Sequence, residues 1–123
     1  MKYLKNFVSK AHCNQIYSYL RDNTGQTYTS DNTRPWFENN NIRNYIIKSS
    51  IEISSYFKET IYPHYTDLVL WHRGKSMEAH VDNGLDILKP RYVSSIIYLN
   101  DNFTGGKTFV DKKEFTPEQG AAL

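Results

Sequence analysis

The character of the sequence changes at Pro63, and this change limits the folds that the chain can adopt. Before Pro63, apolar residues recur at the 3.6-residue spacing of an amphipathic helix. After it, short runs of β-branched and aromatic residues alternate with turn residues about every 8–12 positions. An order of helices followed by short strands predicts an antiparallel sandwich or barrel with helices packed on one side.

Two helices are predicted before Pro63. The first follows Ser9, whose hydroxyl can cap it, and runs to about Asp22 with Cys13, Ile16, Tyr19 and Leu20 on its apolar face. The second covers about 41–60, where one stripe holds Ile42, Ile46, Ile53, Phe57 and Ile61. The polar stretch between them is interpreted as a loop or an edge hairpin, in which Trp36 covers the core edge or contacts a substrate.

Strand-like runs follow at 68–71, 77–81, 92–99 and 107–110. The run 92–99 is the clearest, because both of its faces are largely apolar, as in a strand buried between two layers. Turn residues separate the later runs. Residues 121–123 have the composition of the start of a further strand.

Composition bounds the class of protein. Net charge is +2 and the charges are mixed along the chain, which argues against nucleic acid or an anionic membrane as the main partner. The single cysteine, Cys13, excludes an internal disulfide and a cysteine zinc cluster. No apolar run approaches the roughly 20 residues of a membrane span. The N-terminus also lacks a signal-peptide pattern. We therefore expect a cytoplasmic protein.

His80-Val81-Asp82 is the sharpest chemical feature. Side chains two positions apart on a strand point to the same face, so the imidazole and the carboxylate would converge. They would supply two of the three ligands of a 2-His-1-carboxylate triad, which leaves positions on Fe(II) open for a cosubstrate and O₂. Taken alone, the tripeptide also suits a surface pair at a strand end, so its sequence context matters.

Three motifs provide that context. Residues 68–83 read Leu-Val-Leu-Trp-His-Arg-Gly-Lys-Ser-Met-Glu-Ala-His-Val-Asp-Asn, 91–102 read Arg-Tyr-Val-Ser-Ser-Ile-Ile-Tyr-Leu-Asn-Asp-Asn, and Gly-Gly-Lys-Thr-Phe begins at Gly105. Together they closely resemble the prolyl-4-hydroxylase-like family of Fe(II)/2-oxoglutarate-dependent oxygenases. The resemblance implies one domain over 1–123, with a helical support region over 1–62 packed on one sheet of a double-stranded β-helix (jelly-roll) core over 63–123.

The resemblance also implies roles for single residues. His80 and Asp82 would bind iron. Tyr98 matches a position whose phenol hydrogen-bonds the far carboxylate of 2-oxoglutarate in some members, and Ser94 matches a hydroxyl residue that lines the cosubstrate pocket. Thr108 would lie near that pocket. A core tyrosine and an ordinary strand threonine are the alternative interpretations of Tyr98 and Thr108.

Two residues depart from the family pattern. Trp71 stands where many members carry a Tyr that contacts the cosubstrate, and an indole N–H can donate a hydrogen bond but not accept one. We therefore assign Trp71 to the cosubstrate pocket with a changed arrangement. Lys107 replaces a frequent Glu in the Gly-Gly motif.

The third iron ligand is not matched. In the family, a Pro-x-x-Gly turn leads into a strand, followed by the distal His and a basic residue that pairs with 2-oxoglutarate. Residues 117–123 match the lead-in, and His12, His64 and His72 do not match the distal position. We therefore expect truncated C-terminal strands, open sheet edges that favour self-association, and weak or no turnover.

The implied activity is a dioxygenase reaction that hydroxylates an aliphatic C–H bond and releases succinate and CO₂. Fe(II), 2-oxoglutarate and O₂ are the implied cofactors, with ascorbate keeping the iron reduced. A prolyl residue in a peptide or protein is the family's best-known substrate. Two alternatives stay open: a non-catalytic binding module on the same scaffold, and a cupin-like metal enzyme that uses His80 with other histidines.

Overall fold

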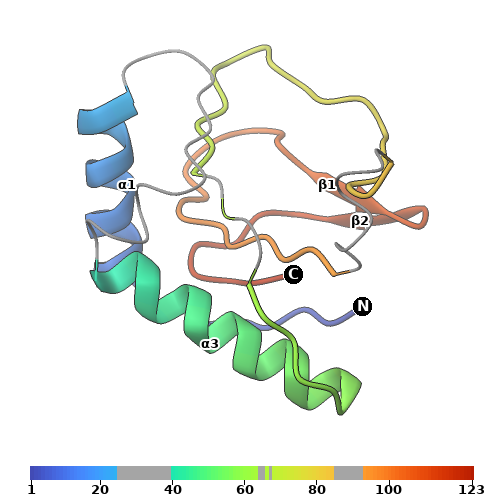
Figure 1. Cartoon of the computed structure of the whole chain (residues 1–123). Helices are drawn as coiled ribbons and strands as arrows, with labels where there is room; N and C mark the ends of the chain where they lie inside the picture. Colours follow the sequence, from blue (N-terminus) through green and yellow to red (C-terminus); the bar gives the residue numbers. More distant parts are fainter. Residues whose placement is uncertain (25–39, 64–65, 67, 85–92) are drawn as a thin grey trace.

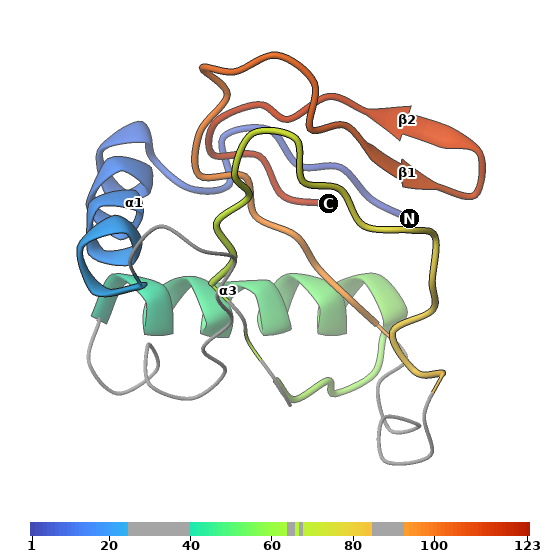
Figure 2. The same ribbon diagram turned by 90° about the horizontal axis from the view of Figure 1, so that it is seen from above.

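The computed structural model describes residues 1–24, 40–63, 66, 68–84 and 93–123. Their order is α1 (Lys10–Thr24), α3 (Asn40–Phe57), β1 (Thr108–Val110) and β2 (Lys113–Phe115). Figures 1 and 2 show α1 and the β1–β2 hairpin at opposite ends of the molecule, and the two chain ends near one another. Neither helix in this described part is long and apolar enough to cross a membrane.

Helix α1 begins as the sequence predicts. The backbone amide of His12 donates to the Ser9 hydroxyl over 3.3 Å, which satisfies one of the free amides of the first turn. Its predicted apolar face is buried: Cys13, Ile16 and Leu20 are each 4% exposed or less. This face fixes α1 against the rest of the core.

Helix α3 packs through its N-terminal half. Ile42 and Ile46 join Ile16 and Leu20 of α1, together with Leu68, in one buried cluster. The predicted stripe loses contact toward its end, where Phe57 is 48% exposed. The core between the two helices is therefore built from the first two turns of α3.

The end of α3 has a backbone cause. Lys58 adopts a left-handed φ of 55°, and the Glu59 amide donates to the Ser54 carbonyl over 3.1 Å. This pattern is a Schellman C-cap, which stops a helix at the preceding residue. The helix therefore ends at Phe57, whereas the apolar stripe predicted that it would end at about residue 60.

The C-terminal segment 120–123 lies between two other parts of the chain. On one side the Leu4 and Ala122 backbones exchange two hydrogen bonds, at 2.8 and 2.9 Å. On the other side Ile96 and Leu123 exchange two more, both at 2.9 Å. Ala122 bridges both neighbours in antiparallel fashion. A second buried cluster, formed by Phe7, Val8, Cys13 and Ala122, packs beneath this junction.

The jelly-roll prediction is wrong. The regular β-structure of the described ranges is one two-stranded antiparallel sheet, β1–β2. The runs 68–71 and 77–81 form no strand, and the described part of 92–99 forms a single bridge, from Ile97 to Ala122. A ladder needs a partner of matching length. Leu68 instead packs on the helices, and the partner of Ile97 is a segment of four residues.

The turn of the β1–β2 hairpin contains a residue whose substitution should stabilise the fold. Asp111 and Lys112 both have positive φ, 48° and 65°, as a two-residue type I′ turn requires. A lysine in that conformation is strained and a glycine is not. We expect Lys112→Gly to raise the free energy of unfolding by about 0.5–1 kcal/mol.

Urea denaturation followed by circular dichroism measures this effect. The matched control is Lys113→Gly, one residue later in β2, where glycine weakens a strand and stability should fall. Equal effects of the two substitutions would contradict the turn assignment.

Candidate functional site

The two predicted iron ligands meet without a strand beneath them. Residues 75–81 have no regular secondary structure, and a turn closed by the Gly84 amide on the Val81 carbonyl (3.2 Å) contains Asp82. His80 Nε2 nevertheless lies 3.2 Å from Asp82 Oδ1. The two side chains are 52% and 49% exposed, so the pair is open to solvent and to ligands.

The other ring nitrogen of His80 determines what the pair can bind. His80 Nδ1 lies 2.9 Å from the Glu78 carbonyl oxygen. A carbonyl oxygen only accepts, so Nδ1 carries the hydrogen. Nε2 then faces a carboxylate oxygen, which also accepts. Two accepting atoms this close need either a shared hydrogen or a metal ion between them.

The separation of the pair fits a metal ion. Two ligand atoms at right angles on an octahedral divalent ion, each about 2.1 Å from it, are about 3 Å apart. The 3.2 Å between His80 Nε2 and Asp82 Oδ1 matches that spacing. Among the residues that the structure describes, no group of three His, Cys, Asp or Glu side chains is close enough to hold a metal. This part of the chain thus offers two ligands.

Ser94 joins the pair from a distant segment. Its hydroxyl donates a hydrogen bond to Asp82 Oδ2, the oxygen that does not face His80. The backbone two residues further on is paired with the C-terminal segment, through Ile96 and Leu123. Ser94 therefore links the exposed loop that carries His80 and Asp82 to the segment that pairs with the C-terminal residues.

Tyr98 and Thr108 form a second group. The Tyr98 hydroxyl donates to Thr108 Oγ1 on β1 over 2.8 Å, and Tyr98 is only 9% exposed. Tyr98 lies four positions after Ser94, which is about 13 Å along an extended chain. The predicted site residues therefore fall into two groups on one segment: Ser94 with the His80–Asp82 pair, and Tyr98 with Thr108.

The residues that depart from the family pattern lie at the surface. Trp71 is 45% exposed, on the segment that leads to His80. Lys107 forms an ion pair with Glu114 of β2, and both side chains are nearly half exposed. Gly105 and Gly106 adopt positive φ, 87° and 64°, a conformation that glycine reaches without strain.

Of the other histidines, the structure describes His12 and His72, and neither forms a three-residue metal group with the pair. His12 Nδ1 lies 2.6 Å from the Tyr45 hydroxyl, which joins α1 to α3. His72 Nε2 is shielded from solvent and has no hydrogen-bond partner in the described part of the chain. His64 and Trp36 lie outside the described residues, as does Arg91 at the start of the second motif.

Sequence reasoning missed a polar hollow that is lined by none of the predicted site residues. Its volume is about 270 Å³, and it is lined by Asn14, Tyr17, Asn100, Asp101, Asn102 and Gln119. The Gln119 side-chain amide donates to Asn14 Oδ1 (2.8 Å) and to the Leu99 carbonyl (3.1 Å). Three separate parts of the chain build this hollow, so no local sequence signal announces it.

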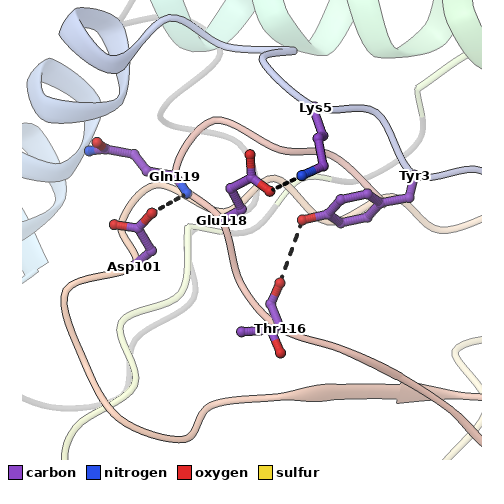
Figure 3. Close-up of polar contacts among 6 residues, drawn as sticks. All are labelled: Tyr3, Lys5, Asp101, Thr116, Glu118 and Gln119. Carbon is purple, nitrogen blue, oxygen red and sulfur yellow. Dashed lines mark hydrogen bonds and ion pairs between the residues drawn. The ribbon is translucent and has the colours of Figure 1, made fainter.

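Polar contacts brace the turn that leads into the C-terminal segment (Figure 3). The backbone amide of Gln119 donates to Asp101 Oδ2 over 3.0 Å, and Lys5 Nζ lies 2.9 Å from Glu118 Oε2. The hydrogen bond to Glu118 raises the pKa of the Lys5 amino group. Nearby, burial raises the pKa of the Cys13 thiol, so this cysteine packs as an unreactive thiol.

Comparisons of the chain with protein-family models, with curated proteins and with solved structures found no match. The likeness to the oxygenases therefore rests on the three sequence motifs.

Proposed function

We propose that this chain binds Fe(II) through His80 and Asp82 and uses it, with 2-oxoglutarate and O₂, to hydroxylate an aliphatic C–H bond. A prolyl residue of a peptide or protein is the proposed substrate, and succinate and CO₂ are the co-products. The observation that carries the proposal is the 3.2 Å between His80 Nε2 and Asp82 Oδ1. Iron, when bound there, would supply the activation of O₂.

Each residue of the pair has a defined task in this proposal. The Glu78 carbonyl holds the hydrogen of His80 on Nδ1, which leaves the Nε2 lone pair for the metal. Asp82 offers Oδ1 and one negative charge, which partly balances a divalent ion. Both side chains are half exposed, so water and cosubstrate can reach the positions that the protein leaves open.

Tyr98 and Thr108 are the proposed anchor for the far carboxylate of 2-oxoglutarate, and the loop that carries His80 and Asp82 would have to move toward them for one cosubstrate molecule to reach both groups. Their hydroxyls are 2.8 Å apart, and each can donate one hydrogen bond. A carboxylate that displaced their mutual bond would accept from both. Ascorbate is the proposed reductant that keeps the iron in its ferrous state.

We expect binding and turnover to be weak. Three protein ligands define a facial triad, and the described residues supply two. A purified sample incubated with Fe(II), 2-oxoglutarate, ascorbate and air should release succinate faster than the same mixture without protein. Succinate is measured by mass spectrometry, and an added proline-containing peptide is searched for a gain of one oxygen.

Omission of iron is the first control and His80→Ala is the second, and both should return the rate to that of the protein-free mixture. Succinate release at that blank rate by the unmodified chain, together with no saturable metal binding, would overturn the proposal.

A non-catalytic binding module is the second candidate, and the polar hollow is the observation that favours it. The hollow is rich in side-chain amides and carries one carboxylate, that of Asp101. Under this alternative, small polar metabolites raise the melting temperature without any metal. Gln119→Ala would then abolish the shift, and Asp82→Ala would leave it unchanged.

A further inference from the structure

We propose that Ser94 is a positioning residue that orients the Asp82 carboxylate for the metal. This inference rests on the proposed function, because it assigns a task at the same site. Ser94 donates to Asp82 Oδ2, and His80 Nε2 faces Asp82 Oδ1. Asp82 Oδ2 thus accepts from the Ser94 hydroxyl, and Asp82 Oδ1 faces the proposed metal position.

This arrangement matters because Asp82 is half exposed in an irregular loop. A carboxylate at such a place rotates freely unless a hydrogen bond fixes it, and ordering it upon metal binding costs free energy. With Oδ2 engaged by Ser94, the carboxylate offers a single oxygen to the ion. That leaves more of the coordination positions open for cosubstrate and O₂.

Ser94 can perform this task because its own backbone is anchored. Ile96, two residues later, exchanges two hydrogen bonds of 2.9 Å with Leu123. Residues 75–81, in contrast, form no regular secondary structure. The Ser94 hydroxyl therefore attaches the irregular loop that carries Asp82 to a segment whose backbone is held by hydrogen bonds. Outer partners of metal ligands typically contribute about 10–100-fold to metal affinity.

The test compares variants that differ in the hydroxyl alone. Thr and Val have nearly the same shape, so Ser94→Thr keeps the donor and Ser94→Val removes it. Mn²⁺ serves as a redox-stable probe, titrated without 2-oxoglutarate, with the free ion followed by electron paramagnetic resonance. Because no cosubstrate is present, the affinity reports on Asp82 and not on a cosubstrate contact.

We expect Ser94→Val to raise the Kd for Mn²⁺ by about 10–100-fold, and Ser94→Thr to stay close to the unmodified chain. Ser95→Val, a change at the neighbouring exposed serine, is the matched control and should have no effect. Circular dichroism confirms folding of each variant. If Ser94→Val does not fold, Ser94→Ala takes its place as the donor-free variant.

Two results would overturn the inference and leave the proposed function intact. One is an unchanged Kd in Ser94→Val while Asp82→Ala loses binding. The other is an equal loss in Ser94→Thr and Ser94→Val. No binding of Mn²⁺ by the unmodified chain would overturn the inference and the proposed function together.

Discussion

Gly120→Ala should lower the free energy of unfolding by roughly 3–5 kcal/mol, enough to unfold many domains of this size. A Cβ added at Gly120 would lie 2.2 Å from the Val8 carbonyl oxygen, far inside van der Waals contact. Gly120 also has a φ of 84°, which a residue with a side chain rarely adopts. The clash and the strain act at the same position.

The surroundings of Gly120 leave little room for relaxation. Its amide donates to the Tyr98 carbonyl over 2.8 Å, and its carbonyl accepts from the Val8 amide over 2.9 Å. Moving Gly120 away from Val8 therefore breaks contacts on both sides. Val8 itself is 1% exposed, so it cannot retreat into solvent.

Gly74→Ala is the matched control for this prediction. Gly74 has nearly the same φ, 80°, but a Cβ there would meet nothing within 4 Å. The free energy of unfolding of Gly74→Ala should fall only by the conformational strain, about 1 kcal/mol. The difference between the two variants in urea denaturation then isolates the clash. Equal losses would show that the approach of Gly120 to Val8 does not stabilise the fold.

The same junction explains why the sequence predicted the helices better than the β-structure. Helix α1 follows from local signals, because Ser9 caps it and its apolar face repeats with the helical period. The pairing of residues 120–123 depends on Leu4 and Ile97, which are remote in sequence. Nothing in Gly-Ala-Ala-Leu specifies two neighbours, so this segment was predicted as the start of a strand and is instead the centre of the junction.

Strand β2 was missed for a local reason. Asp-Lys is not a usual pair for a type I′ turn, which favours Asn-Gly or Asp-Gly. For residues 92–99 the error was the opposite one, because a strand was predicted that the described part of this run does not form. Their β-branched composition predicts a strand, but composition cannot supply a partner of equal length. Expecting a jelly roll from such runs overestimated how far local preference determines sheet pairing.

The candidate site shows the same division between local and distant information. The side chains of His80 and Asp82 were predicted to converge because they would share one face of a strand; their atoms do lie 3.2 Å apart, but in a loop without a strand. The contact of Ser94 with Asp82 spans twelve residues and has no local signal. The roles of these residues, and those of Tyr98, Thr108 and Trp71 in binding 2-oxoglutarate, stay predictions.

Asp82→Asn should abolish saturable binding of Mn²⁺ while the fold is kept. The substitution preserves the shape of the side chain but removes the negative charge that a divalent ion needs beside the His80 imidazole. We expect at least a 100-fold loss of affinity, which corresponds to about 2.7 kcal/mol. An exposed ion pair contributes about 0–1 kcal/mol to folding, so the stability of the metal-free chain should change little.

Thermal unfolding with and without Mn²⁺ separates a metal site from a simple ion pair. A bound metal stabilises the folded state, so Mn²⁺ should raise the melting temperature of the unmodified chain and leave that of Asp82→Asn unchanged. Asp111→Asn, in the exposed hairpin turn, removes the same charge elsewhere and should keep the full shift. If Mn²⁺ stabilises Asp82→Asn as strongly as the unmodified chain, the metal binds elsewhere. In that case the contact between His80 and Asp82 is a polar contact that holds no metal.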